Sequence, residues 1–403
     1  MRRLILHIGL PKTGTTALQH FFTENRKLFG EQGILVPKTP QNVHRAYGVV
    51  FEASQPFPHE RVWKQVRDLF AEKTDAVLVS HEDLSTHMAK NPEGVLRELV
   101  EYFSEIDVRI QIVVYLRRQD LHYESLYNQD VKYYCTSNTF NPTPEDDSII
   151  NSNGISLSIY HYYEWLHRIA EIIGKENAFI RIYDRASFAG GDIFHDFVSA
   201  IGIDYDDRFV LPAADPNPGI DSQYLELCRY ANSVYSKDEL TRQDTVDKIL
   251  FYKFMLFINN QLGRTGDKGL FLDAERLKFL ERFSESNRRL FEFIGRENIF
   301  SVEPLRHAEM KTARETLDAL DLREIVVLLH RRWLECSCGM SYPVRNYLRL
   351  KLAQIKMKKG DPGARRKLRR YRLIHSVGKR LVPGWPSTGE MEVVLGEMPL
   401  DVN

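Results

Sequence analysis

The chain has 403 residues, of which 43% are hydrophobic and 27% are charged, and its formal net charge at pH 7 is zero. Such a composition is typical of a folded globular protein long enough for two or three domains, and it excludes wholesale disorder. No apolar run reaches the ~18 residues that a membrane-spanning helix needs, and the four scattered cysteines exclude a disulfide framework.

The chain opens with the pattern of a strand, a loop and a helix. Residues 4–8 form an apolar run rich in branched side chains, Gly9 and Gly14 bound a turn, and residues 15–22 are compatible with a helix. Backbone N–H groups in such a loop, and those at the start of the helix, converge on one spot that attracts an anion. The pattern therefore predicts a phosphate-binding loop.

The lysine of this loop stands in an unusual place. Gly9 and Gly14 have the spacing of an ATP-type phosphate loop, but Thr15 occupies the position of the lysine in that motif, and the lysine lies inside the loop as Lys12. From the crown of the loop, Lys12 would extend toward the bond that breaks at the terminal group of a bound anion. We interpret it as a positive charge held over a leaving group.

After the loop, strands alternate with helices. Apolar strands are expected at residues 33–37, 75–80, 108–116 and 178–183, and helices at residues 17–29, 61–72, 92–103, 121–134, 159–173 and 192–201. Asp120 is expected to cap the helix that begins at residue 121. Apolar strands that alternate with helices indicate a parallel sheet covered on both faces. The predicted fold is α/β, a P-loop nucleotide-binding fold with a central parallel sheet of about five strands flanked by helices.

Extra helices and a basic tail follow. Helical patterns occur at residues 223–235, 245–262, 273–294 and 320–334. Residues 345–380 contain fourteen Lys or Arg and a single acid, Asp361. We expect a domain over residues 1–344 with a C-terminal helical elaboration, and a flexible basic tail over residues 345–403. The tail is interpreted first as a solvated segment and, if it has a role, as a loose contact with an anionic membrane surface.

Polar residues gather where ligands of a parallel sheet bind, at the carboxyl ends of the strands. The glycine-bounded loop, residues 81–83 and the pair Arg117 and Arg118 all follow predicted strands. Residues 135–153 are polar and too long for a simple connector, which makes them a candidate lid or a disordered segment.

Arg117 and Ser125 suggest a second anion site. Arg117 ends a strand, and Ser125 lies eight positions further along, on the next helix. A guanidinium gives paired, charge-assisted hydrogen bonds, and a hydroxyl adds a third, which suits a phosphate group.

The two sites together resemble those of a known enzyme family. Six consecutive residues resemble the 5′-phosphosulfate loop of sulfotransferases that use 3′-phosphoadenosine 5′-phosphosulfate (PAPS): Pro11, Lys12, Thr13, Gly14, Thr15 and Thr16. Arg117 and Ser125 resemble the 3′-phosphate site of the same family. The resemblance covers roughly residues 1–185 and extends, more faintly, to bacterial carbohydrate sulfotransferases at residues 284–287. The Arg-Lys-Gly element of the cytosolic small-molecule branch is not matched by residues 263–269, so the residues around the adenine stay unassigned.

The resemblance implies PAPS as co-substrate, transfer of its sulfuryl group to an acceptor hydroxyl, and no metal. Lys12 would stabilise the leaving bridge oxygen, and a base must take the hydroxyl proton. His44 has a suitable ordinary pKa of ~6.5, whereas the pKa of Glu82 would have to be raised by burial. We rank His44 and Glu82 level as the base and His81 third.

Two other classes of function remain open. A P-loop kinase or nucleotidase would use ATP and magnesium, with Glu82 or Asp83 as its acid, but it requires a lysine after Gly14. A non-catalytic module would bind anionic glycan or membrane through the basic tail, and it leaves Lys12 and Arg117 unexplained.

The expected partner is a sugar hydroxyl of a glycolipid or polysaccharide, and no nucleic acid is expected. The short apolar start at residues 4–10 runs directly into the loop, unlike a secretory signal. We therefore expect a bacterial, cytoplasmic enzyme, peripheral at most at the inner membrane face.

Overall fold

The computed structural model describes residues 2–37, 60–72, 74–132, 136–212 and 269–300, and five further residues between 224 and 232. The chain divides into two compact units, one of residues 1–135, 139–219 and 269–310 and one of residues 136–138, 220–268 and 311–403. Every strand and helix named below belongs to the first unit. His44, the basic tail and the predicted boundary between residues 344 and 345 lie outside the described residues.

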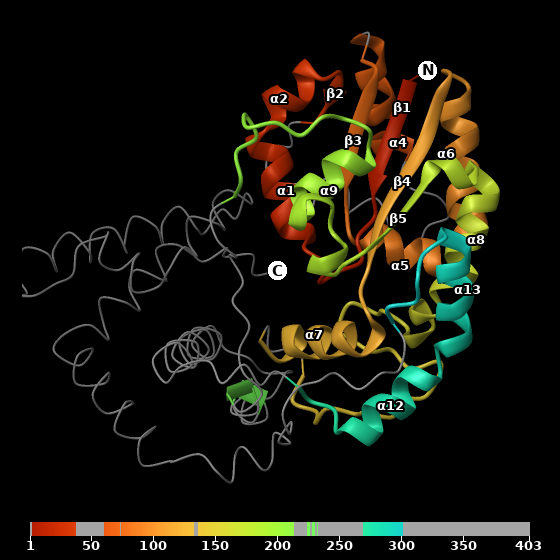
Figure 1. Ribbon diagram of the computed structural model, residues 1–403. Coiled ribbons are helices and arrows are strands. Elements are labelled where there is room, and N and C mark those ends of the chain that lie inside the picture. Colours follow the sequence, from red (N-terminus) through yellow and green to blue (C-terminus); the bar gives the residue numbers. More distant parts are fainter. Residues whose placement is uncertain are drawn as a thin grey trace, which may run out of the picture. The chain divides into compact units, whose positions relative to one another are not determined.

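A five-stranded parallel sheet forms the centre of the first unit (Figure 1). In the spatial order β2-β3-β1-β4-β5, its strands are β1 (Arg2–His7), β2 (Ile34–Leu35), β3 (Ala76–Ser80), β4 (Val108–Leu116) and β5 (Ala178–Ile182). All four neighbouring pairs run parallel, and Leu4 of β1 lies between Val77 of β3 and Ile110 of β4. The predicted α/β fold with a central parallel sheet of five strands is confirmed.

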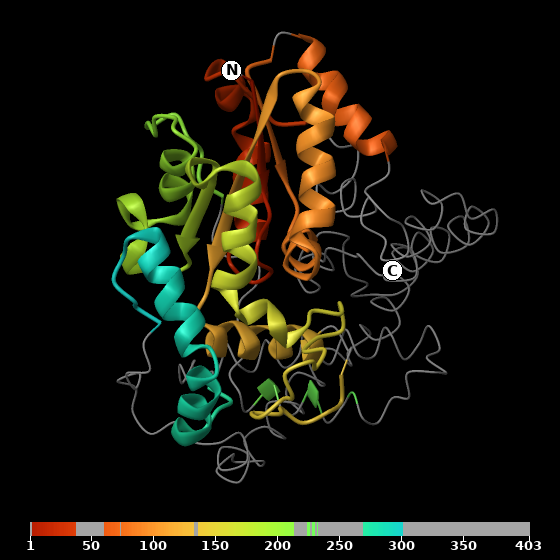
Figure 2. The ribbon, with the colours of Figure 1, turned by 90° about the vertical axis from the view of Figure 1, so that its right-hand side faces the viewer.

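Two hydrophobic cores cover the two faces of the sheet, because successive side chains of a strand point to opposite faces. Leu4 and Leu6 of β1 belong to one core, and Ile5 belongs to the other. The helices that pack on the Ile5 face are α1 (Thr15–Glu24), α2 (Arg26–Glu31) and α9 (Ile193–Ala200). Those on the Leu4 face, which Figure 2 brings to the front, include α4 (Glu60–Asp68), α5 (Asp83–Lys90), α6 (Pro92–Ser104) and α8 (Tyr162–Ile173).

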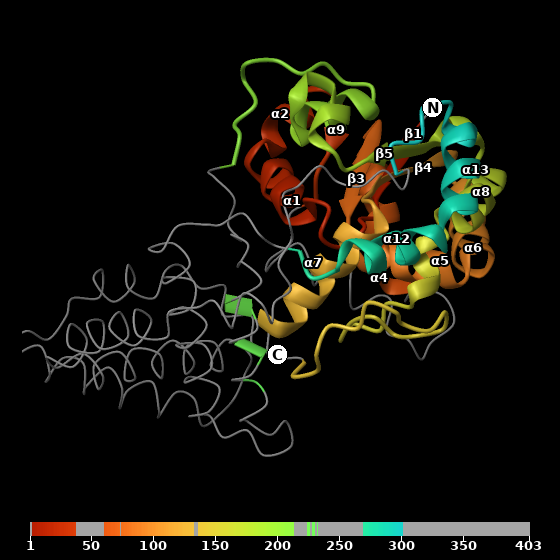
Figure 3. The ribbon, with the colours of Figure 1, turned by 60° about the horizontal axis from the view of Figure 1, so that its bottom comes forward.

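A third group of helices lies at the carboxyl ends of the strands. Helix α7 (Gln119–Lys132) follows β4 and crosses beneath these ends, with α12 (Asp273–Glu281) beside it and α13 (Ser284–Ile294) continuing up along α8 (Figures 1 and 3). The single-turn helix η3 (Leu157–Tyr160) leads into α8. No helix within the described parts of the chain is long and apolar enough to cross a membrane.

Several helix boundaries differ from the sequence-based expectation. The helix expected over residues 17–29 is two helices, because the side-chain amide of Asn25 donates to the carbonyls of Phe21, at 2.9 Å, and Val210, at 2.8 Å. The helix expected over residues 273–294 is likewise divided into α12 and α13, and α5 was not predicted.

The prediction that Asp120 caps the helix after β4 is wrong. Helix α7 begins at Gln119, so Asp120 lies within its first turn. Its carboxylate accepts hydrogen bonds from Nε and Nη2 of Arg118, both at 2.7 Å. Asp120 is therefore part of a buried ion-pair network rather than a cap.

Candidate functional site

The loop between β1 and α1 is fixed to strand β4 on one side and to the start of helix α5 on the other. The ladder between β1 and β4 continues past the end of β1, through hydrogen bonds from Leu10 N to Tyr115 O, at 3.2 Å, and from Tyr115 N to Gly9 O, at 2.8 Å. On the other side, Ser85 N donates to Ile8 O at 3.2 Å. The loop thus lies at the carboxyl end of the central strand, where ligands of such sheets bind.

Both glycines of the motif are required by their surroundings. Gly9 has a φ of +98°, and a Cβ there would lie 3.1 Å from the Cα of Glu82. Gly14 has a φ of +79°, and a Cβ there would lie 2.8 Å from Cδ1 of Ile193. An L side chain would be strained at either position and would push the loop away from β3 or α9.

Three consecutive carbonyls of the loop are each held by a side chain. The carbonyl of Leu10 accepts hydrogen bonds from the hydroxyls of Thr13, at 2.6 Å, and Thr15, at 3.0 Å. The carbonyl of Pro11 accepts one from Nε2 of His122 at 2.7 Å, and that of Lys12 one from Nη1 of Arg117 at 3.4 Å. These carbonyls face the protein, as an anion-binding loop requires if its N–H groups are to face a ligand.

The start of α1 supplies further donors. Its first intrahelical hydrogen bond runs from Leu18 N to Gly14 O, at 3.0 Å, so the N–H groups of Thr15, Thr16 and Ala17 precede the helical ladder. Gly14 at the N-cap has no side chain to cap them, and the first turn contains no acidic residue. The N-terminus of α1 therefore presents donors and the positive end of the helix dipole.

Lys12 lies at the crown of the loop with a φ of +63°, a left-handed conformation that is uncommon for a residue with a side chain. Its side chain is half-buried. Its charge acts on two neighbours, since it lowers the pKa of both Glu82 and His122. Lys12 is thus electrostatically coupled to the end of β3 and to α7.

Glu82, directly after β3, is the carboxyl group coupled to this loop. Burial, together with the negative charge of Asp83, raises the pKa of Glu82 to about 7, although the charge of Lys12 and a hydrogen bond with the side chain of Thr15 act in the opposite direction. A carboxyl group with such a pKa can accept a proton near neutral pH.

The other two base candidates are placed differently. His81 is buried, and its Nδ1 accepts a hydrogen bond from the backbone N–H of Asp83 at 3.2 Å. That nitrogen is therefore engaged in holding the turn after β3. His44 lies outside the described residues, so its candidacy stays a prediction.

Arg117 is brought to the loop, and Ser125 is placed on the adjoining helix. The guanidinium of Arg117 contacts the carbonyl of Lys12 and lies 5.8 Å from the centre of the Tyr183 ring, while the backbone carbonyl of Arg117 accepts a hydrogen bond from the Tyr162 hydroxyl at 2.8 Å. Ser125 is half-buried on α7, eight positions after Arg117, which precedes the helix. The structure therefore joins Arg117 to the loop, and the pairing of Arg117 with Ser125 stays a prediction.

His122 was not recognised from the sequence as part of the site. It lies on α7, is fully buried, and reaches the loop across 111 positions of sequence. A lone histidine on a helix gives no signal of its partner, because only the packing of α7 beneath β1 brings it to Pro11.

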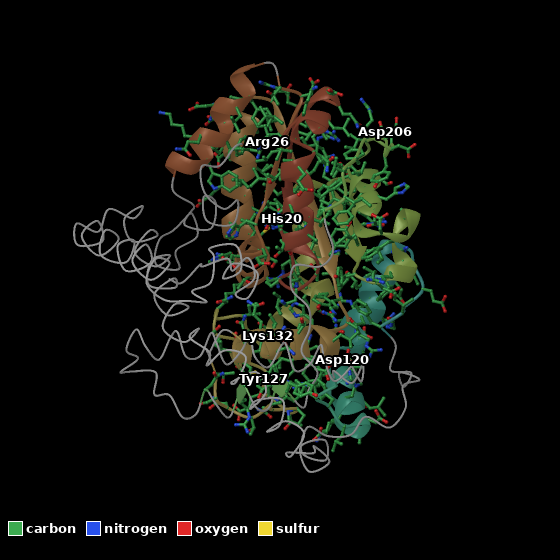
Figure 4. The ribbon with its side chains drawn as sticks, turned by 90° about the vertical axis from the view of Figure 1, so that its left-hand side faces the viewer. His20, Arg26, Asp120, Tyr127, Lys132 and Asp206 are labelled. Atoms are coloured by element: carbon green, nitrogen blue, oxygen red, sulfur yellow. The ribbon has the colours of Figure 1, made fainter. Side chains whose placement is uncertain are left out.

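Buried ion pairs hold α7 to α12. Arg276 of α12 contacts the carboxylates of Asp120 and Glu124, and all three side chains are buried. Glu124 also accepts a hydrogen bond from Leu270 N at 2.7 Å. Burial alone would raise the pKa of Asp120, but hydrogen bonds from Arg118 and the charges of Arg118 and Arg276 outweigh it and lower that pKa. Figure 4 shows Asp120 near one end of α7 and Lys132 near the other.

Within the described ranges, no group of three or more His, Cys, Asp or Glu side chains is placed to hold a metal ion. The expectation that the reaction needs no metal stays a prediction.

No family model matches the chain. An uncharacterized protein of Archaeoglobus fulgidus is 30% identical over 212 residues, which make up 51% of this chain and 52% of that protein, so the chain spans about half the length of this curated relative. A sulfotransferase from Alicyclobacillus acidocaldarius, of known crystal structure, aligns with 74% of this chain and 97% of that one, at a TM-score of 0.40 and 13% sequence identity. Neither similarity assigns a function to the chain.

Proposed function

We propose that the chain is a sulfotransferase that moves the sulfuryl group of PAPS to a hydroxyl of an acceptor. The observation that carries this proposal is the loop after β1. The carbonyls of Leu10, Pro11 and Lys12 in this loop are held by side chains of the protein. The first N–H groups of α1 precede its helical hydrogen bonds, and Lys12 lies at the crown of the loop. Together with the six-residue motif of the loop, this arrangement favours a ligand whose terminal anionic group binds the loop, with Lys12 over the bond that breaks.

The residues present fit such a co-substrate. The start of α1 has uncapped donors and no acid in its first turn, so the loop has no negative group of its own there. Arg117 and the loop lie together at the carboxyl edge of the sheet, which suits a ligand with two anionic ends. We assign the terminal sulfate and its phosphate to residues 11–16, and the 3′-phosphate to Arg117 and Ser125.

Lys12 and Glu82 have complementary roles in the proposed reaction. Bound PAPS would supply a sulfuryl group that is joined to a phosphate through an oxygen. Lys12 holds its ammonium charge where negative charge collects on that oxygen. Glu82, with a pKa raised to about 7, takes the proton of the acceptor hydroxyl. We favour Glu82 over His81 because Nδ1 of His81 is engaged with the backbone, and His44 remains the alternative base.

The acceptor is proposed to be a sugar hydroxyl of a glycolipid or polysaccharide. This assignment rests on the resemblance of the sequence to carbohydrate sulfotransferases. The cytoplasmic location and the loose contact of residues 345–380 with an anionic membrane belong to the same proposal.

A transfer assay with sulfur-labelled PAPS tests the reaction. The purified chain is incubated with labelled donor and a panel of glycolipids and polysaccharides, and the label is expected to move to one class of acceptor. Calorimetry with adenosine 3′,5′-bisphosphate and with ATP plus magnesium separates the rival enzyme class. Tight binding of ATP with magnesium and none of the bisphosphate would favour a kinase or nucleotidase and reject the proposal.

A further inference from the structure

His122 joins the loop to two other elements. On α7, its Nε2 lies 2.7 Å from the carbonyl oxygen of Pro11, and its Nδ1 lies 2.9 Å from the hydroxyl of Tyr160, at the end of η3. The ring is fully buried and meets the Tyr160 ring edge to face, at 5.5 Å and 89°. One side chain therefore connects the crown of the loop to both α7 and η3.

These contacts fix the tautomer of the ring. A carbonyl oxygen only accepts hydrogen bonds, so Nε2 must carry the proton that it donates to Pro11. Nδ1 is then unprotonated and accepts the hydrogen bond of the Tyr160 hydroxyl. The two contacts specify opposite roles for the two nitrogens, which keeps the donor aimed at the loop.

The ring is also neutral at ordinary pH. Burial, together with the charges of Arg117 and Lys12, lowers the pKa of His122 to about 3, although the contact with Pro11 acts in the opposite direction. A neutral donor holds the loop without adding a second positive charge that would compete with Lys12 for an anion.

Lys12 depends on such support because of its backbone conformation. A residue with a side chain is held at a φ of +63° only where its surroundings fix the backbone. The carbonyl before this φ angle belongs to Pro11 and is bound by His122, and the carbonyl after it belongs to Lys12 itself and is bound by Arg117. Loss of either anchor frees the peptide that sets the direction of the lysine.

We infer that His122 is a positioning residue of the proposed transfer: its hydrogen bond to Pro11 holds the loop so that Lys12 stands over the leaving group. The inference rests on the proposed function for its rate measurement. It assigns His122 no contact with substrate and no proton transfer.

The test compares His122→Ala with His122→Gln, which keeps an N–H donor, and with Leu99→Ala. Leu99 is buried on α6 in the core of the same unit and serves as a matched control for lost packing. We expect the kcat of His122→Ala to fall about 10-fold or more with the KM for PAPS changed less than about 3-fold, because misplacement of a catalytic group chiefly affects the chemical step. Gln should restore part of kcat, and Leu99→Ala should keep the wild-type kcat.

Equal kcat values for His122→Ala and Leu99→Ala would overturn the inference. If His122→Ala does not fold, His122→Leu fills the volume without a hydrogen-bond donor and should show the same fall in kcat. A wild-type kcat in His122→Leu would also overturn the inference.

Absence of transfer by the wild-type chain would reject the proposed function but not this inference, which amide hydrogen exchange then decides. Exchange at the hydrogen-bonded amides of Leu10 and Leu18, which flank the loop, should be faster in His122→Ala than in Leu99→Ala, and equal rates would overturn the role of His122.

Discussion

Lys12 is the residue on which the proposed chemistry depends most directly. It stands at the crown of the loop, coupled to Glu82 and His122, rather than after Gly14 as in ATP-type loops. A lysine at the position after Gly14 would contact the phosphates in both the ground state and the transition state. A lysine at the crown would instead interact most strongly with the negative charge that develops on the leaving oxygen. The difference predicts an effect on turnover that exceeds the effect on binding.

Replacement of Lys12 by Ala should lower kcat about 10²-fold or more, which is the scale for loss of one preorganised donor to a developing charge. The affinity for adenosine 3′,5′-bisphosphate should fall far less, since the N–H groups of the loop remain. Steady-state kinetics and calorimetry on the same preparation measure the two effects. Lys12→Arg keeps the charge and is the matched control, and a near-normal rate in Lys12→Ala would exclude the assigned role.

Glu82 should impose a pH dependence on the rate. A base works only when ionised, and the pKa of Glu82 is raised to about 7, so kcat should rise as the pH increases through about 7 and level off above it. Glu82→Gln should remove most of the activity together with this rise. If Glu82→Gln kept both the rate and the pH profile, Glu82 would not be the base, and His44 would become the preferred candidate.

The same carboxyl group should also affect stability, with the opposite trend in pH. Its pKa is raised from 4.5 in the unfolded chain to about 7 in the folded chain, so the folded state retains a proton that the unfolded state releases. The stabilisation from this proton is full below about pH 4.5 and is lost as the pH rises through about 7. Relative to Glu82→Gln, the wild type should lose about 2 kcal/mol of unfolding free energy between pH 5 and pH 8, measured by urea denaturation. Parallel pH profiles for the two proteins would show that Glu82 is not desolvated.

At the scale of elements, α12 stabilises the helix that carries His122 and Ser125. Arg276 lies between the buried carboxylates of Asp120 and Glu124, and Leu270 donates to Glu124 from the segment that leads into α12. Hydrogen bonds between Gln119 and Asn287, at 2.7 Å and 3.3 Å, add a second connection between the start of α7 and α13. The position of α7 therefore depends on residues about 150 positions further along the chain.

Arg276→Ala tests this dependence, because it leaves the buried carboxylate of Glu124 without its ion-pair partner and that of Asp120 with Arg118 alone. The unfolding free energy should fall by about 3–5 kcal/mol, the usual range when one member of a buried ion pair is removed. Arg288 on α13 is the matched control, since its pairs with Glu285 and Glu292 are exposed and should contribute little. Similar denaturation midpoints for Arg276→Ala and Arg288→Ala would show that the buried network does not hold α7.

The strands were predictable from sequence, and the breaks and long-range contacts of the helices were not. A nearly continuous apolar run such as residues 108–116, interrupted only by Arg109 and Gln111, identifies a buried strand whichever neighbours it has. The end of α1 depends on Asn25 binding Val210, 185 positions away, and the loop depends on His122 binding Pro11. The motif thus indicated the N–H donors of the loop and of the start of α1. The side chains that hold this loop come from other elements, and their contacts with it leave no pattern in the local sequence.

At the scale of the whole molecule, the charge is unevenly distributed. The formal net charge of the chain is zero, although residues 345–380 contain fourteen Lys or Arg and only one acid. The rest of the chain therefore carries a net negative charge of the same size. A net negative charge does not help an enzyme to attract an anionic donor. A local basic segment suits attraction to a separate anionic surface instead.

This reasoning predicts that the purified chain binds vesicles containing phosphatidylserine and does not bind neutral phosphatidylcholine vesicles. Replacement of Arg365, Arg366 and Lys367 by Ala should weaken that binding by about 100-fold, since each basic residue near an anionic surface contributes about 1 kcal/mol. Added salt should weaken the wild-type binding in the same direction. Vesicle sedimentation measures the partition. Calorimetry with adenosine 3′,5′-bisphosphate is the control, because the bisphosphate is proposed to bind residues 11–16 and not the basic segment, so its affinity should not change. If the triple variant kept its vesicle binding, the basic segment would not be the membrane contact. If it lost its affinity for the bisphosphate, the tail would belong to the donor site.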